Sequence, residues 1–200
     1  MKRNRSESKY FNTACLMDEA LIALLAKKEL EYITVKEICE KAGVHRSTFY
    51  LHYETMGDLL EESVAHVADN FREYMERETA CFPGGISELP KEELDLVTPR
   101  YLIPYLEYVK KNATLFRTAM KNPVTFRLEK TYAKMVSEIF EPVMARLDVP
   151  SHDRRFVVAY HLNGLIAIVR EWLKGECAEP VEYIASLMRR CSTGGDASRN

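Results

Sequence analysis

The stretch TVKEICEKAGVHRSTFYLHY, residues 34–53, determines how the rest of the chain is interpreted. Thr34 stands three residues before Glu37, which is the spacing of a helix-capping box, and apolar residues follow at helical intervals. Gly43 predicts the end of this helix, because glycine readily adopts the left-handed conformation that closes helices. A second short helix is predicted from Arg46 to His52. Two helices joined by a tight turn with a glycine are the layout of a helix-turn-helix.

The second helix of such a unit lies in the major groove of DNA, where its N-terminal residues meet base edges. Arg46, Ser47 and Thr48 carry groups that hydrogen-bond to bases and phosphates. Tyr50 and His52 combine flat apolar rings with polar tips. Taken alone, the first three residues also fit a solvated helix face, and the two rings also fit packing against neighbouring helices.

The composition excludes few classes of protein. Of the 200 residues, 46% are hydrophobic and 29% are charged, which is ordinary for a soluble globular chain. Residues 1–55 hold 9 Lys and Arg against 8 Asp and Glu, and the remaining residues hold 19 against 22. Any basic surface for nucleic acid must therefore come from local arrangement, because the net charge is −2.

Several other features are predicted to be absent. No apolar run approaches 18 residues and no apolar segment follows the basic N-terminus, so we expect no transmembrane helix and no secretory signal. The 5 cysteines form no C-x-x-C pair, which indicates reduced thiols in a cytoplasmic protein. Neither metal-ligand spacing nor a catalytic motif is present, so we expect no metal, no cofactor and no enzyme activity.

The chain is predicted to be all-α, with a three-helix helix-turn-helix domain followed by a larger helical domain. Residues 1–55 are predicted to form the first domain and residues 56–191 the second, in which 56–80 is expected to be a connecting helix. Residues 192–200 are predicted to be a disordered tail. Phe49 is the expected core anchor of the short helix, and Pro142 should kink a long one. Helices are predicted over 8–28, 34–43, 46–52, 56–77, 99–111, 113–121, 124–147, 152–174 and 180–191.

Residues 33–60, ITVKEICEKAGVHRSTFYLHYETMGDLL, resemble the DNA-binding domain of TetR-type transcriptional regulators. The family pattern T-x-x-x-I-x-x-x-A-G-V-x-x-x-T-x-Y-x-H-F is matched by Thr34, Ile38, Ala42, Gly43, Val44, Thr48, Tyr50 and His52, with Tyr53 in place of Phe. The resemblance is dense over about residues 8–65 and implies double-stranded DNA as the partner. The DNA-binding residues that it implies are Thr34, Lys36, His45, Arg46, Ser47, Thr48, Tyr50 and His52.

Two positions depart from the family pattern. His45 stands where serine is frequent, and Met56 stands where a lysine often contacts phosphate at the start of the fourth helix. We expect a basic N-terminal arm to compensate, since each neutralised phosphate adds salt-sensitive affinity. The arm would consist of Lys2, Arg3, Arg5 and Lys9.

In the family, a small-molecule effector pocket lies among the middle helices. Aromatic residues and methionines gather there in this chain, although a packed core is the alternative interpretation for each of them. His161 is the expected polar contact, with a core or interface histidine as its alternative. The predicted pocket residues are Tyr101, Tyr105, Tyr108, Phe116, Met120, Phe126, Tyr132 and His161.

The 152–174 helix is predicted to be a dimer interface, because large residues recur every fourth position and Gly164 allows a second helix to approach. Residues 164–188 are also similar to the C-terminal region of a TetR subgroup that includes regulators of the DhaS type. The alternative is packing within one protomer. The predicted interface residues are Phe156, Tyr160, Gly164, Ile168, Trp172, Ile184, Leu187 and Met188.

The resemblance implies a homodimeric, sequence-specific regulator that represses transcription at a palindromic operator until a small molecule releases it. The DhaS-like region leaves open a regulator or activator that is controlled by a partner protein and has no small-molecule pocket. A cavity of about a few hundred Å³ among the aromatic residues would favour the ligand-responsive alternative.

Overall fold

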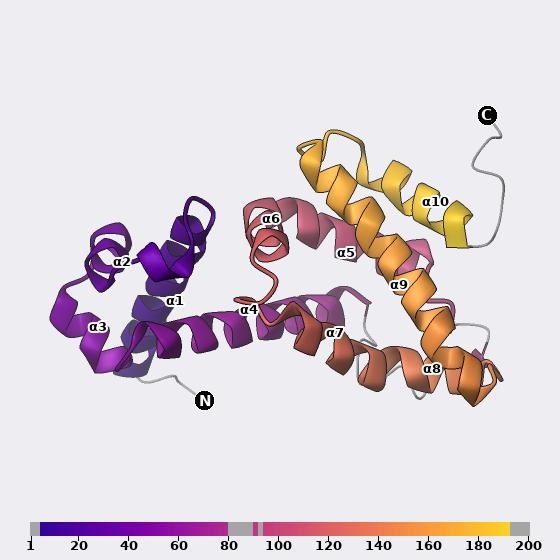
Figure 1. Cartoon of the computed structure of the whole chain (residues 1–200), viewed down its shortest axis with the longest axis horizontal. Helices are drawn as coiled ribbons and strands as arrows, with labels where there is room; N and C mark the ends of the chain where they lie inside the picture. Colours follow the sequence, from indigo (N-terminus) through magenta and orange to yellow (C-terminus); the bar gives the residue numbers. More distant parts are fainter. Residues whose placement is uncertain (1–4, 80–89, 92–93, 193–200) are drawn as a thin grey trace.

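The computed structural model describes residues 5–79, 90–91 and 94–192, and every regular element in these residues is helical. Figure 1 shows α1–α3 at one end, α4 running lengthwise from them, and the remaining helices gathered at the other end. The predicted all-α fold is confirmed. The elements are α1 (Arg5–Leu25), η1 (Leu30–Tyr32), α2 (Val35–Ala42), α3 (Arg46–His52), α4 (Met56–Thr79), α5 (Pro99–Lys111), α6 (Ala113–Lys121), α7 (Leu128–Met135), the π-helix η4 (Val136–Phe140), α8 (Glu141–Arg146), α9 (Ser151–Lys174) and α10 (Val181–Ser192).

The ends of the helices in the helix-turn-helix follow from local chemistry. The Thr34 hydroxyl accepts a hydrogen bond from the Glu37 backbone, and the Glu37 carboxylate accepts one from the Thr34 backbone, so the predicted capping box is present. Gly43 ends α2 with φ of 69°, a left-handed conformation that most side chains disfavour. The boundaries of α3 agree with the prediction at both ends.

The core around the helix-turn-helix draws on both predicted domains. Met17, Leu21, Ile38 and Phe49 have no exposed surface and pack together from α1, α2 and α3. The same cluster includes side chains from α6, from the segment that leads into α7 and from the first residue of α7; these are Leu115, Ala119, Phe126 and Leu128. The second predicted domain therefore contacts the first one directly, as well as through α4.

A second core joins α5, α9 and α10. Leu106, Val109 and Val169 are fully buried in it, together with Met188 of α10. The Trp172 indole lies in the same cluster and donates a hydrogen bond of 3.1 Å to the Glu179 backbone carbonyl. This bond satisfies the one polar group of a large buried side chain.

The helix predicted over 124–147 begins later, at Leu128, and runs without a break to Arg146 through α7, the π-helix η4 and α8. Arg127 precedes α7 with φ of 49°, so the chain is not helical before Leu128. Pro142 lies in the first turn of α8 and has no backbone N–H to donate to the preceding turn. The wider π-turn just before Pro142 accommodates that missing bond. Residues 80–89 and the predicted tail beyond Ser192 lie outside the described residues.

Candidate DNA-binding site and effector cavity

The helix α3 is held in place by one buried ring beneath an exposed polar face. Phe49 is completely buried, and its ring contacts Tyr50 and Tyr53 at centroid distances of 5.4 and 5.7 Å. On the outer side, Arg46 and Ser47 are exposed at the first turn of α3. A short helix anchored in this way presents its N-terminal residues as a rigid surface at the end of the molecule seen in Figure 1.

Arg46 is positioned by Tyr50 one turn further along the helix. Its guanidinium donates a hydrogen bond of 3.2 Å to the Tyr50 hydroxyl and lies 5.6 Å from the centre of that ring. Both side chains are exposed, and His45 is exposed just before the helix. Thr48 is half-buried, so less of it faces outward. The exposed groups include the type of donor that reads guanine edges in a major groove.

His52 packs against α1, which was the alternative interpretation for this residue. Its ring stacks on Tyr10 at a centroid distance of 3.8 Å with planes 19° apart. The His52 Nδ1 atom is buried and has no hydrogen-bond partner within the part of the chain that the structure describes. Burial lowers the pKa of His52, with Glu62 opposing the shift, so the ring is neutral at pH 7. In the DNA-free chain the His52 ring packs α3 against α1.

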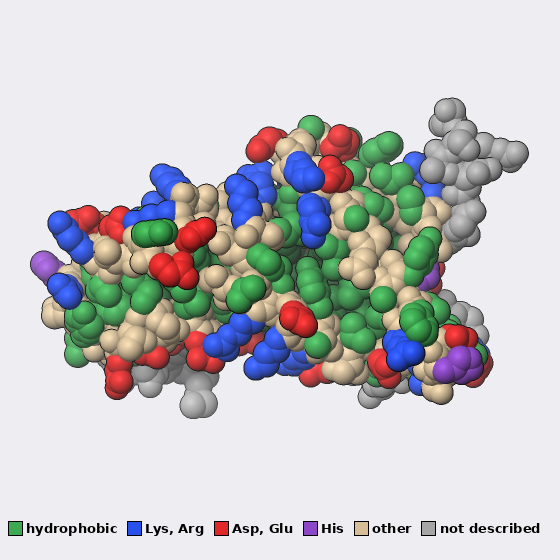
Figure 2. All heavy atoms as spheres, in the orientation of Figure 1, with side chains coloured by type: hydrophobic (Ala, Val, Ile, Leu, Met, Phe, Trp, Pro, Cys, Tyr) green, Lys and Arg blue, Asp and Glu red, His purple; other side chains and the backbone are tan. Residues whose placement is uncertain are grey.

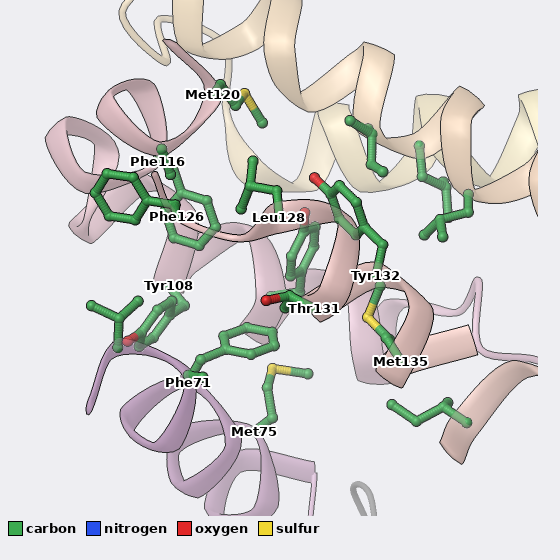
Figure 3. A pocket seen from close by; sticks show the side chains of 18 of the residues that line it. Phe71, Met75, Tyr108, Phe116, Met120, Phe126, Leu128, Thr131, Tyr132 and Met135 are labelled. Atoms are coloured by element: carbon green, nitrogen blue, oxygen red, sulfur yellow. The ribbon is translucent and has the colours of Figure 1, made fainter. Parts of the chain in front are cut away.

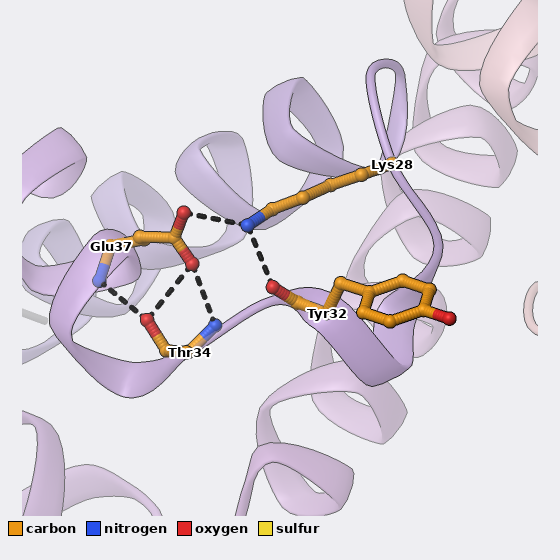
Figure 4. Close-up of polar contacts among 4 residues, drawn as sticks. All are labelled: Lys28, Tyr32, Thr34 and Glu37. Carbon is orange, nitrogen blue, oxygen red and sulfur yellow. Dashed lines mark hydrogen bonds and ion pairs between the residues drawn. The ribbon is translucent and has the colours of Figure 1, made fainter.

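The N-terminus of α2 is closed by a network of polar contacts (Figure 4). Lys28 donates to the Glu37 carboxylate at 2.6 Å and to the Tyr32 carbonyl at 2.7 Å. The Thr34 hydroxyl donates to Glu37 at 2.9 Å and accepts from its backbone, so its one O–H donor is already engaged within the chain. Lys36 extends into solvent beside the network and is 3.7 Å from Glu40.

We expect Glu37→Gln to lower the melting temperature at pH 7. Hydrogen bonds from Lys28 and then from Thr34 lower the pKa of Glu37 from its ordinary 4.5 to about 2. A folded-state pKa below the unfolded value stabilises the fold above pH 4.5, and this contribution is lost as the pH falls towards 2. The melting temperatures of the wild type and the variant should therefore differ at pH 7. The difference should shrink as the pH falls from 4.5 towards 2. Glu31→Gln, an exposed acidic residue in η1, is the control. An unchanged gap at pH 2.5 would contradict the assignment.

Met56 occupies the position at which the family often has a phosphate-binding lysine. It begins α4, and its side chain is half-buried against the core below α3. The Thr55 amide donates to the Asp58 carboxylate at 2.8 Å, so the adjoining helix N-terminus is already capped by an acidic group. Of the predicted N-terminal arm, Lys2 and Arg3 lie outside the described residues. Arg5 and Lys9 lie in the first two turns of α1.

We expect Met56→Lys to strengthen DNA binding by about threefold to tenfold at low salt, because it restores one phosphate contact. The slope of log affinity against log salt should steepen by about 0.9, the value for one neutralised phosphate. Fluorescence anisotropy with labelled duplex at several salt concentrations measures both quantities. Met56→Gln controls for the lost apolar packing; an equal gain for glutamine would exclude the electrostatic explanation.

A cavity of about 260 Å³ lies among α4, α5, α6, α7, α9 and α10. Figure 2 shows hydrophobic side chains lining a hollow between α6, α7 and α9, and Figure 3 shows the interior. The structure brings together seven of the predicted pocket residues: Tyr101, Tyr105, Tyr108, Phe116, Met120, Phe126 and Tyr132. Sequence reasoning missed the walls from α4 and α9, which include Val64, Val67, Phe71, Met75, Leu162, Leu165 and Ile166.

The prediction that His161 lines the pocket is wrong, because its side chain is not among the residues that line the cavity. The cavity face of α9 consists of Leu162, Leu165 and Ile166, which are adjacent on one side of the helix. His161 lies next to that face, and its ring instead contacts Tyr160 at a centroid distance of 5.2 Å.

The cavity shares a wall with the core of the helix-turn-helix. Ala119 and Phe126 are buried in that core and also line the cavity. The next residue, Arg127, is paired with Glu61 of α4 at 2.9 Å, which ties this segment to the connecting helix. A molecule in the cavity would therefore contact residues that pack directly against α1.

The predicted dimer face of α9 is exposed at only one end. Phe156 is 61% exposed, Tyr160 is 74% exposed, and Gly164 has open space where a side chain would extend. Ile168 and Leu187 are half-buried. As a correction, three predicted interface residues lie inside the protomer and offer no surface to a partner; these are Trp172, Ile184 and Met188. Tyr183 of α10, which was not predicted, is 51% exposed.

One described helix, α9, bears on the expectation of no transmembrane helix. Within the described residues, this helix alone is long and apolar enough to cross a membrane by length and composition. Its apolar residues include the buried Val158 and Val169 and three residues of the cavity wall. A core helix of a folded domain has the same composition, so the finding is weak evidence for a membrane segment.

Within residues 5–79, 90–91 and 94–192, no three His, Cys, Asp or Glu side chains lie together in a way that could hold a metal ion. Cys39 and Cys177 are buried thiols, and burial raises the pKa of both, which disfavours the reactive thiolate. The site is therefore defined by α3 and by the apolar cavity.

A helix-turn-helix with an exposed recognition helix, joined to a helical domain with an internal cavity, defines a DNA-binding regulator. Residues 19–63 match the family model described as bacterial regulatory proteins, tetR family, and residues 99–194 match a transcriptional regulator C-terminal region. The chain belongs to the TetR family of transcriptional regulators.

A sequence relative is an uncharacterized HTH-type transcriptional regulator, YxbF, from Bacillus subtilis (strain 168). The two are 46% identical over 170 residues, which is 84% of this chain and 41% of the relative, so the chain spans less than half of that protein.

Two solved structures share the fold. A TetR-like regulator from Rhodococcus sp. RHA1 has a TM-score of 0.65 and 18% identity over 94% of this chain and 97% of its own. The dihydroxyacetone kinase operon activator DhaS has a TM-score of 0.54 and 15% identity over 91% and 94%. At these identities, the likeness concerns the fold.

Proposed function

We propose that the chain is a homodimeric repressor that binds a palindromic DNA site through α3 of each protomer and is released by a small molecule. Residues 1–55 would bind DNA, and residues 56–191 would bind the effector and the second protomer. The observation that carries this proposal is the exposed first turn of α3, with Arg46 and Ser47 fixed above the fully buried Phe49. Such a regulator acts in the cytoplasm and needs neither a cofactor nor a membrane.

The shared wall supports an effector-responsive mechanism. Ala119 and Phe126 face both the cavity and the core beneath α1, while Phe71 and Met75 bring α4 to the same cavity. A ligand that prefers one arrangement of these walls would change the position of α3 in each protomer, and so the spacing of the two recognition helices. The response depends only on the difference between its affinities for the two arrangements.

A regulator controlled by a partner protein, with a filled core, is the second candidate. The cavity of about 260 Å³ argues against it, because a filled core would leave no such space. If the chain binds a DNA site and no small molecule changes that binding, the regulator controlled by a partner protein is favoured instead.

The test is selection of bound sequences from a random DNA pool, repeated with Arg46→Ala. We expect a palindrome to be enriched by the wild type. Arg46→Ala should weaken binding about tenfold to 100-fold and relax the preference at one position in each half-site, because a base contact is worth about 1–3 kcal/mol.

Two substitutions give the matched comparison. Lys36→Ala should weaken binding evenly across sequences, since an exposed lysine at this place would contact phosphate. Lys174→Ala removes the same charge at the C-terminal end of α9, outside the helix-turn-helix, and should change nothing. Enrichment of no sequence by the wild type would overturn the proposed sequence-specific regulator.

A further inference from the structure

The lining of the cavity carries almost no polar surface. Its walls are made of aliphatic, methionine and aromatic side chains, with hydroxyls as the polar groups, and no Asp, Glu, Lys, Arg or His of the described chain is among them. The aromatic rings contact one another edge to face: Phe71 lies 5.2 Å from Tyr108, and Tyr108 lies 6.1 Å from Phe116. Such rings offer edges and faces to another flat apolar group.

Several tyrosine hydroxyls lie in the cavity wall, and those of Tyr105 and Tyr132 are the pair that interact electrostatically with each other. Tyr105 of α5 and Tyr132 of α7 both line the cavity, and Figure 3 shows the Tyr132 hydroxyl directed towards Leu128. Neither hydroxyl has a hydrogen-bond partner among the residues that the structure describes. By contrast, the Thr131 hydroxyl is already engaged by the Arg127 carbonyl at 3.3 Å.

Burial, and then the neighbouring Tyr132, raise the pKa of Tyr105, and burial also raises the pKa of Tyr132. Both phenols are therefore protonated at neutral pH, and each can donate or accept one hydrogen bond. A polar group left without a partner in an apolar cavity is costly, so the two hydroxyls favour a ligand that satisfies them.

We propose that the cavity binds an uncharged, mainly apolar and partly aromatic molecule, with one polar group that hydrogen-bonds to Tyr105 and Tyr132. This inference rests on the proposed effector function and specifies the chemistry of its ligand. A charged ligand would have to leave water for a site with no counter-charge in its walls. The guanidinium of Arg170 in α9 opposes the rise in the pKa of Tyr132, because a positive charge favours the ionised phenol. The Arg170 side chain is nevertheless not among the residues that line the cavity.

The test uses two dyes with the same ring system. N-phenyl-1-naphthylamine is uncharged, and its relative anilinonaphthalene sulfonate differs by one sulfonate; both brighten in apolar surroundings. Titrated into the 200-residue chain at pH 7, the uncharged dye should bind at least about tenfold more tightly, because the sulfonate must be desolvated without a partner.

Leu165→Trp fills the cavity from α9 and should abolish binding of the uncharged dye. Val124→Trp adds the same ring at a position that is 89% exposed and should leave binding intact. Circular dichroism confirms that both variants are folded. Dye binding that is equal in the two variants would place it outside the cavity and overturn the inference.

The hydroxyls are tested with 1-naphthol and 1-methylnaphthalene, two uncharged molecules of similar shape that compete with the dye. The wild type should prefer 1-naphthol by about threefold to tenfold, as expected for one net hydrogen bond. The double variant Tyr105→Phe, Tyr132→Phe, which keeps both rings, should bind the two equally. An unchanged preference would overturn the role of the hydroxyls.

The outcomes separate this inference from the proposed function. Cavity binding of the sulfonate dye as tightly as the uncharged one, lost in Arg170→Ala, would indicate an anionic ligand and overturn the inference while leaving effector binding in place. If neither dye nor either naphthalene binds, both the inference and the effector role of the cavity are overturned. DNA selection with Arg46→Ala still tests DNA recognition independently.

Discussion

Asp18→Ala is expected to destabilise the chain by about 3 kcal/mol, the range for removal of one partner from a buried charged network. Asp18 lies in α1 and is only 5% exposed. Its carboxylate accepts a hydrogen bond of 2.6 Å from Ser63 and contacts His66 Nδ1 at 2.8 Å, both from α4. Alanine would leave a buried hydroxyl and an imidazole without their acceptor at the junction between the helix-turn-helix and the connecting helix.

Urea unfolding followed by circular dichroism measures this loss, and the melting temperature should fall by about 6–12 °C for a chain of this size. Asp18→Asn keeps an acceptor oxygen and should lose less than half as much. Asp69→Ala removes an exposed carboxylate paired with Arg72 at 2.7 Å on the same helix, and should cost about 0–1 kcal/mol. If the two alanine variants lose equal stability, the buried network does not hold α1 against α4.

The sequence was sufficient for the helix-turn-helix because the signals there are local. The Thr34–Glu37 box, Gly43 and the short apolar pattern around Phe49 each act within one or two helical turns. The network of Asp18 was not predicted, since its partners lie 45 and 48 residues away in the sequence. A carboxylate on an apolar stripe was the available signal, and it does not identify the partner.

The contact between the cavity and the helix-turn-helix core also could not be predicted from the local sequence pattern. Phe126 was assigned to the pocket, which its position supports, but its burial in the helix-turn-helix core depends on the turn at Arg127 and on the contact between α6 and α1. The domain boundary near residue 55 was drawn from the start of α4 and therefore could not reveal a core shared across it.

The α9 stripe shows how a regular spacing can mislead. Residues four apart on a helix advance by about 40° around the axis, so the sixteen residues from Phe156 to Trp172 advance by about 160°. The stripe consequently begins in solvent at Phe156 and Tyr160 and ends in the core at Trp172. A sequence pattern gives the spacing, whereas only the packing of α5 and α10 decides which end of the stripe is covered.

Tyr160→Glu is expected to weaken the proposed dimer at least about 100-fold, because like charges or unpaired charges in an interface cost several kcal/mol. The residue is 74% exposed in the protomer and lies one turn from Phe156, so a carboxylate there is tolerated by the monomer. In a two-fold dimer the substitution occurs twice. Sedimentation equilibrium should show the wild type near twice the protomer mass of 23.1 kDa and the variant near that mass.

The matched control is Tyr32→Glu, which makes the same change at a tyrosine that is 69% exposed in η1, far from α9. It should remain dimeric. A wild type that is monomeric at all concentrations, or a Tyr160→Glu variant that stays dimeric, would contradict the α9 interface. Because α3 is unchanged in the variant, loss of the dimer alone should reduce binding of a palindrome to that of a single half-site. Operator affinity would then fall although Arg46 is present.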